Sequence, residues 1–105
     1  MSSERTRKCN ITQKVRKIVN ERDGFSCVFC GSSYGVQLCH VVPRSKGGLG
    51  IPENLVCGCA ACHGRMDQSV DRADMLAQAD DYLRSIYPEF DQVRKIYQKW
   101  NGLFN

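Results

Sequence analysis

The chain has 105 residues, a length that suits one compact domain and excludes a large multidomain enzyme, a Rossmann enzyme of usual size and a TIM barrel. Hydrophobic residues make up 42% and charged residues 25%, close to the average of globular proteins, which argues against a disordered or fibrous chain. The net charge is a modest +4, but seven cysteines are many for so short a chain. This cysteine content indicates metal, disulfide or redox chemistry.

No apolar signal-peptide core follows the first residues, and no stretch is apolar enough for a membrane span. We therefore expect a cytoplasmic protein with no membrane partner. In a reducing cytoplasm, clustered cysteines bind metal more often than they form disulfides, and an odd number of cysteines fits a disulfide framework poorly.

Charge is distributed unevenly along the chain. Residues 1–22 are mostly basic, whereas residues 66–92 are mostly acidic. A basic end suggests an anionic partner such as nucleic acid, and a solvated charged face is the alternative. Residues 1–9 show no hydrophobic periodicity and are predicted to form a flexible basic arm, ahead of a single domain over residues 10–105.

The hydrophobic pattern predicts helices and short strands in this domain. An amphipathic helix should begin at Asn10, as its N-cap, and end at residues 23–24. Residues 36–42 predict a strand, and residues 54–57 predict a second short strand. The glycine-rich segment 44–52 between them predicts a loop long enough to be functional.

Three further helices are predicted after the second strand. The first follows Cys59, and a second is indicated by the apolar stripe from Met75 to Ile86, which Pro88 ends. A third is indicated by apolar residues at helical spacing: Phe90, Val93, Ile96, Tyr97 and Trp100. We expect both C-terminal stripes to be core, in an α+β domain with a motif core over residues 25–68 and a helical cap over residues 70–104.

The cysteine pairs Cys27-x-x-Cys30 and Cys59-x-x-Cys62 have metal-binding spacing. Two intervening residues let both thiolates of a pair reach one ion at about 2.3 Å. Four thiolates would close a tetrahedral structural zinc site, and paired disulfides or ordinary buried thiols are the alternatives. The two pairs are separated by more residues than in a simple zinc ribbon, so we expect the segment between them to contain a further element of the domain.

His40 and Asn54 lie between the cysteine pairs, and His63 directly follows the second pair. This arrangement resembles the HNH endonucleases of the ββα-metal fold, also called His-Me fingers. The resemblance covers residues 22–67, and the C-terminal part is similar to small HNH proteins carried by bacteriophages and prophages. It implies a ββα-metal core with an N-terminal helix and a four-cysteine zinc, acting on DNA in a bacterial host cell.

The resemblance implies three catalytic roles. His40 would be the general base, since an ordinary histidine pKa of about 6.5 suits proton transfer near neutral pH. Asn54 would orient and polarise the His40 imidazole through a hydrogen bond, with a turn-forming asparagine as the alternative. His63 would bind a catalytic divalent metal, Mg²⁺, Mn²⁺, Ni²⁺ or Zn²⁺, which stabilises the scissile phosphate and the leaving oxygen.

Two more metal ligands are considered. Asp67 lies one helical turn after His63 and shares its face, as a second helical ligand does in colicin-type members. Cys39 stands where many members place an aspartate or histidine ligand. Because a thiolate is soft and suits zinc far better than magnesium, Cys39 is either an unusual ligand or a buried bystander.

Contacts to DNA phosphates are expected from three basic residues, Arg44, Lys46 and Arg65. The loop glycines Gly47, Gly48 and Gly50 are expected to let the backbone approach the duplex closely.

The sequence thus predicts metal-dependent cleavage of DNA, by nicking or double-strand cutting. A zinc-stabilised DNA-binding module without catalysis is the first alternative, and only Cys39 supports it. An accessory role in a phage packaging or restriction machine is the second, and it is compatible with cleavage.

Overall fold

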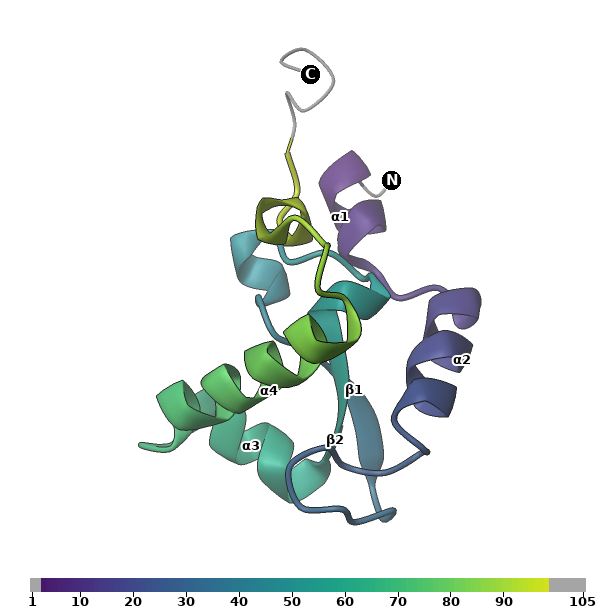
Figure 1. Cartoon of the computed structure of the whole chain (residues 1–105). Coiled ribbons are helices and arrows are strands. Elements are labelled where there is room, and N and C mark those ends of the chain that lie inside the picture. Colours follow the sequence, from purple (N-terminus) through teal and green to yellow (C-terminus); the bar gives the residue numbers. More distant parts are fainter. Residues whose placement is uncertain (1–2, 99–105) are drawn as a thin grey trace.

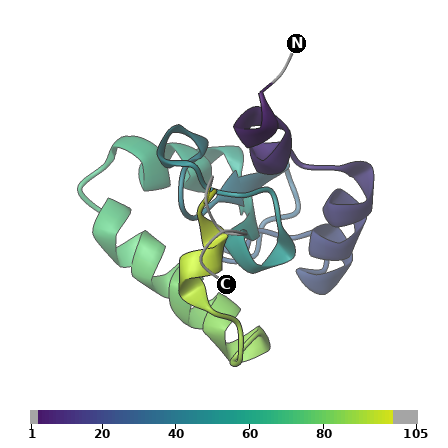
Figure 2. The ribbon, with the colours of Figure 1, turned by 90° about the horizontal axis from the view of Figure 1, so that it is seen from above.

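A two-stranded antiparallel sheet lies at the centre of the structure, a computed structural model that describes residues 3–98 (Figure 1). Strand β1, Val36–His40, pairs with strand β2, Leu55–Cys59, so that His40 lies opposite Leu55. Helix α2, Gln13–Arg22, covers one face of the sheet, and helices α3, Ala60–Gln68, and α4, Arg72–Ile86, cover the other. Figure 2 shows the same arrangement from above.

Hydrophobic side chains fill the space on both faces of the sheet. On the α2 side, Val19 packs against Leu55 and Cys57. On the other side, Cys39 and Val56 pack with a larger cluster from α3, α4 and the cysteine pairs: Cys27, Cys59, Cys62, Met66, Met75, Ala79 and Leu83. Consecutive residues of a strand point to opposite faces, so β2, which is buried along its whole length, has apolar or small residues at every position. The predicted α+β class is confirmed.

The N-terminal residues differ from the flexible arm that the sequence predicted. They form a short helix, α1, Glu4–Cys9, in which the Ser3 hydroxyl accepts a hydrogen bond from the Thr6 N–H at 3.1 Å. Cys9, the last residue of α1, is only 3% exposed. A helix this short depends on tertiary contacts rather than on its own hydrophobic pattern, which is why the sequence did not indicate it.

Helix α2 begins later than predicted. The Thr12 hydroxyl accepts a hydrogen bond from the Val15 N–H at 3.2 Å, so Thr12 rather than Asn10 is the N-cap. Asn10 instead follows the C-terminal end of α1.

The last predicted helix is wrong over residues 90–98. Helix α4 ends at Ile86, just before Pro88, and from there to residue 98 the one further helical element is a 3₁₀ turn, Gln92–Lys95. The next residue, Ile96, forms a β-bridge with Gly48 of the loop. Trp100 lies outside the described residues.

Backbone pairing with the loop replaces helical hydrogen bonds in this segment. The Leu49 N–H donates to the Lys95 carbonyl at 2.8 Å, and the Tyr97 N–H donates to the Gly47 carbonyl at 2.7 Å. The predicted apolar stripe is therefore not core here, since Val93 is 62% exposed. Among residues 3–98, no helix combines the length and the apolar character needed to cross a membrane.

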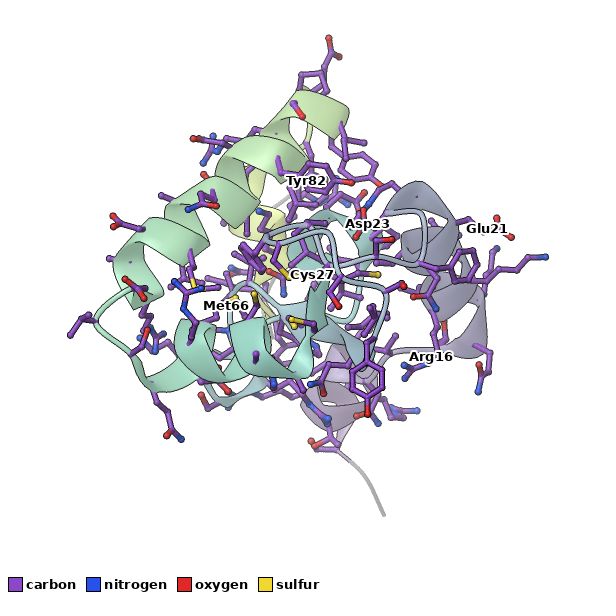
Figure 3. The ribbon with its side chains drawn as sticks, turned by 90° about the horizontal axis from the view of Figure 1, so that it is seen from below. Arg16, Glu21, Asp23, Cys27, Met66 and Tyr82 are labelled. Carbon is purple, nitrogen blue, oxygen red and sulfur yellow. The ribbon has the colours of Figure 1, made fainter. Side chains whose placement is uncertain are left out.

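Arg22 and Asp23 form a buried polar junction between α2, β2 and α4. The Arg22 guanidinium binds the Asp23 carboxylate through two contacts, at 2.7 and 2.9 Å, and donates to the Leu55 carbonyl at 2.6 Å. Asp23 also accepts hydrogen bonds from the Tyr82 hydroxyl and, at 2.9 Å, from the Cys57 N–H; Figure 3 shows Asp23 and Tyr82 close together. Burial alone would raise the pKa of Asp23, but the hydrogen bonds from Arg22, Tyr82 and Cys57 outweigh it and lower this pKa.

Asp23→Asn should lower the free energy of unfolding by about 3 kcal/mol, because it leaves the buried Arg22 charge without its partner. The lowered pKa also makes wild-type stability fall as the pH drops below the ordinary aspartate value of about 4, and the variant should lack this component. Urea unfolding at several pH values measures both effects. The exposed Asp81→Asn is the control, and equal stability of the two variants would contradict the role of the junction.

Candidate active site and metal centre

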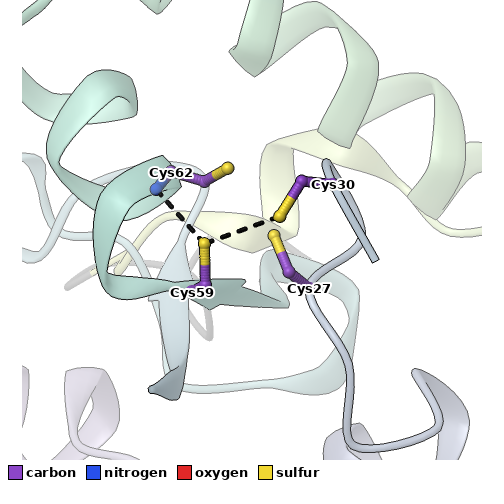
Figure 4. Close-up of side chains that lie close together, drawn as sticks. All are labelled: Cys27, Cys30, Cys59 and Cys62. Atoms are coloured by element: carbon purple, nitrogen blue, oxygen red, sulfur yellow. Dashed lines mark hydrogen bonds between the residues drawn. The ribbon is translucent and has the colours of Figure 1, made fainter. Parts of the chain in front are cut away.

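Four cysteine sulfurs converge at the junction of β2 and α3 (Figure 4). The ligand atoms of Cys27, Cys30, Cys59 and Cys62 all lie within 4.8 Å of one another. The Cys30 and Cys59 sulfurs are 3.6 Å apart, far beyond a disulfide bond and close to the separation of about 3.8 Å that a tetrahedral zinc site with bonds of about 2.3 Å requires. The Cys59 sulfur also accepts a hydrogen bond from the Cys62 N–H at the start of α3.

The chemistry of these thiols fits a bound zinc ion. Burial and the neighbouring thiols raise the pKa of Cys62 to about 12, whereas backbone N–H groups overcome the effect of burial and lower the pKa of Cys27 to about 6. Four thiolates this close repel one another unless a cation lies between them. Among residues 3–98 this is the one cluster of three or more histidine, cysteine or carboxylate side chains placed to hold a metal.

We expect one tightly bound zinc per chain, with a large share of the folding free energy linked to it. Cys59→Ser should lower the zinc content to less than half an equivalent and lower the melting temperature, whereas Cys9→Ala, which removes a buried thiol outside the cluster, should retain zinc. Elemental analysis and thermal unfolding with and without a strong chelator measure these effects. An unchanged melting temperature after chelation would contradict the zinc site.

His40 lies at the end of β1 and is half-buried. Its Nε2 is 2.9 Å from the backbone carbonyl oxygen of Cys9. Because a carbonyl oxygen only accepts hydrogen bonds, Nε2 carries the proton and Nδ1 is the basic nitrogen. Burial, with a smaller contribution from the Arg44 charge, lowers the pKa of His40 below its ordinary value, so the ring is neutral near pH 7.

Asn54 does not make the hydrogen bond to His40 that the sequence predicted. Its fully buried amide donates to the Val42 and Leu49 carbonyls at 3.2 and 2.9 Å, and its oxygen accepts from the Val42 N–H at 2.9 Å. Both amide protons are therefore used within the loop between the strands. This prediction is wrong because Asn54 fixes the path of that loop, and it affects His40 only through the backbone.

A cavity of about 520 Å³ brings His40 together with Asp67 of α3. Lys46, one of the predicted DNA contacts, also lines it, as does Arg72 from the first turn of α4. Sequence analysis missed Arg72 because the spacing of the motif ends before α4. Its position four residues after Gln68, the last residue of α3, was the one available signal.

His63 and Asp67 are paired on one face of α3, as their spacing predicted. The His63 Nε2 and an Asp67 carboxylate oxygen lie 3.7 Å apart, and the two side chains are 36% and 55% exposed. Two such groups can bind one divalent ion, with water and phosphate oxygens completing its coordination. No third protein ligand from the described part of the chain joins this pair.

The position of Cys39 favours the bystander interpretation. The residue is 1% exposed, and it belongs to the hydrophobic cluster that contains Val56 and Met66, on the face of the sheet opposite to that of His40. Burial, followed by the charge of Asp67, raises the pKa of its thiol to about 12, so the group is protonated. A protonated thiol is a poor metal ligand.

Cys39→Ala should therefore leave DNA cleavage and its metal preference within about twofold of wild type, while the lost packing costs about 1 kcal/mol of stability. Cleavage assays with Mg²⁺, Mn²⁺, Ni²⁺ and Zn²⁺ in turn test the activity, and urea unfolding tests the stability. A changed order of metal preference would identify the thiol as a ligand after all.

The other predicted DNA-contacting residues differ in their surroundings. Arg65 is paired with Asp71 at 2.9 Å, and Arg44 donates to the side-chain oxygen of Asn10. Two of the loop glycines pack closely against the chain itself. A Cβ on Gly48 would lie 1.7 Å from the Val42 carbonyl oxygen, and a Cβ on Gly50 would lie 2.2 Å from the Asn10 carbonyl oxygen. Their close approach to DNA stays a prediction.

Comparison with known proteins agrees with this geometry. Residues 27–75 match the family model described as HNH endonuclease. Four chains of solved structures match, among them the structure of the type IV phosphorothioation-dependent restriction endonuclease ScoMcrA, with a TM-score of 0.63 and 20% identity. The match covers 75% of this chain and 17% of the ScoMcrA chain, so it shows a shared fold over a small part of that protein. No curated protein matches the chain.

The matched segment contains both cysteine pairs together with His40, Asn54 and His63. The resemblance inferred from these residues is confirmed, and the two-stranded sheet followed by α3 agrees with a ββα-metal core. Over residues 27–75 this chain is therefore similar to the HNH endonuclease family.

Proposed function

We propose that this chain is a metal-dependent endonuclease that hydrolyses phosphodiester bonds in DNA. The observation that carries the proposal is the cavity in which a neutral histidine, His40, lies with the carboxylate of Asp67 and the cations Lys46 and Arg72. A base, a metal-binding carboxylate and positive charge are the groups that phosphodiester hydrolysis requires. The HNH family match supports the same chemistry.

His40 acts as the general base in this proposal. Its Nδ1 takes a proton from the attacking water. Its Nε2 keeps its own proton and donates a hydrogen bond to the Cys9 carbonyl. The lowered pKa of His40 keeps the ring able to accept that proton at neutral pH. Lys46 and Arg72 hold the phosphate against the base, since both line the same cavity.

His63 and Asp67 are the side chains that would hold the catalytic divalent metal. Bound there, such an ion would stabilise negative charge on the scissile phosphate and on the departing oxygen. Asp67 lines the cavity with His40, and His63 lies one helical turn before it. The four-cysteine cluster has a structural role, because a closed set of four thiolates leaves no position for substrate.

His40→Ala should lower the rate of plasmid cleavage by about 10²- to 10⁴-fold, the usual contribution of a general base. Zinc content and DNA affinity should stay unchanged, because neither the cysteine cluster nor the cationic side chains are altered. Gln37→Ala, an exposed change on the same strand, is the control. Cleavage by His40→Ala within tenfold of wild type, or DNA binding by wild type without any cleavage, would favour a DNA-binding module instead.

Asp67→Ala and His63→Ala should each raise the divalent metal concentration needed for half-maximal cleavage by about tenfold or more, because each removes a ligand. Titration of Mg²⁺ or Mn²⁺ into the cleavage assay measures this shift. Asp81→Ala removes an exposed carboxylate of α4 and controls for the loss of negative charge. A metal requirement unchanged in both ligand variants would move the metal site elsewhere.

A further inference from the structure

The ring of His40 is held by a segment outside the HNH motif. Its Nε2 partner is the carbonyl of Cys9, the last residue of α1, whereas the family match begins at Cys27. The two residues are 31 positions apart in the chain. The hydrogen bond therefore exists only while α1 lies against the end of β1, where His40 is placed.

The C-terminal end of α1 is well suited to this role. The last carbonyls of a helix have no partner within the helix and must find one outside it. Here the Lys8 carbonyl accepts from the Gly50 N–H of the loop at 3.0 Å, and the Cys9 carbonyl accepts from His40. Two of these free carbonyls are thus satisfied by the loop and by the base.

Further contacts hold α1 on the loop. The Arg5 guanidinium donates to the Ser45 carbonyl at 3.0 Å, and Arg44 donates to the Asn10 side chain. Gly50 lets the two backbones touch, since its Cβ position is 2.2 Å from the Asn10 carbonyl oxygen and 3.0 Å from that of Cys9.

We propose that docked α1 is a positioning element for the general base, in which the Cys9 carbonyl fixes the Nε2-protonated tautomer of His40 and leaves Nδ1 as the basic nitrogen. Asn54 cannot replace it, because both of its amide protons are bound to the loop carbonyls of Val42 and Leu49. Asn54 fixes the path of the loop, and α1 fixes the orientation and the tautomer of the His40 ring. The inference rests on the proposed role of His40 as base.

The tautomer can be observed directly. The chain contains two histidines, so ¹⁵N spectra of the imidazoles in the zinc-loaded full chain can be assigned with His63→Ala. In wild type we expect His40 to show a protonated Nε2 and an unprotonated Nδ1. A His40 ring with its proton on Nδ1, or an even mixture of tautomers, would overturn the inference whatever the activity.

Two arginines of α1 give a matched pair of variants. Arg5→Ala removes the hydrogen bond to Ser45, whereas Arg7→Ala removes the same charge from the same helix, where residues 3–98 show no hydrogen bond from the Arg7 side chain to the loop. Arg5→Ala should shift His40 toward a tautomer mixture and lower kcat about threefold or more relative to Arg7→Ala, with equal KM for DNA in both. If Arg5→Ala and Arg7→Ala have the same tautomer populations of His40 and the same kcat, the Arg5–Ser45 contact does not support the base.

Gly50→Ala perturbs the acceptor more strongly, since its new methyl group must displace the Cys9–Asn10 backbone. We expect kcat to fall about tenfold or more with zinc content retained, together with loss of the fixed tautomer. If Gly50→Ala keeps the wild-type tautomer of His40 and the wild-type kcat, the inference is overturned. If the variant does not fold, the comparison of Arg5→Ala with Arg7→Ala tests the inference instead. Failure of the proposed function looks different, because His40→Ala would then still cleave DNA.

Discussion

The convergence of the four cysteines is the constraint on which the rest of the structure depends. Cys27 and Cys30 lie before β1, Cys59 ends β2, and Cys62 lies in the first turn of α3, so their sulfurs connect three segments at one point. Hydrophobic packing is not directional, whereas one ion bound by four thiolates would fix these segments at defined distances from one another. The direction in which α3 leaves the sheet is set there, and with it the placement of Asp67 beside the cavity.

The loop between the strands is held in a different way, through backbone contacts rather than side-chain packing. Asn54 binds the Val42 and Leu49 backbone from inside the loop, and the segment containing Ile96 and Tyr97 pairs with it from outside. Buried polar groups cost free energy unless they are paired, so a loop with this many internal partners has few alternative paths. His40, at the edge of this loop, therefore has a fixed position although its side chain is only half-buried.

Features that depend on spacing along the chain could be predicted from the sequence. The two cysteine pairs, the His63–Asp67 pair on one helical face and both strands follow from periodicity and ligand geometry. Contacts between polar groups that are distant in the chain left no such pattern, which is why the hydrogen bond from Tyr82 to Asp23 and the true partners of Asn54 were not foreseen. The segment after Pro88 had a helical apolar pattern, but pairing with the loop overrode it.

The buried junction has a consequence for where this domain can be divided. Arg22, Asp23 and Tyr82 all lie outside residues 27–75, and so does Cys9. The recognisable motif and the cooperative folding unit therefore have different boundaries. Grafted onto another scaffold, the motif would bring its histidines and cysteines but neither the helix that covers one face of its sheet nor the acceptor for its imidazole. A host protein would have to supply both at matching places, which restricts how freely such a module can be exchanged between larger proteins.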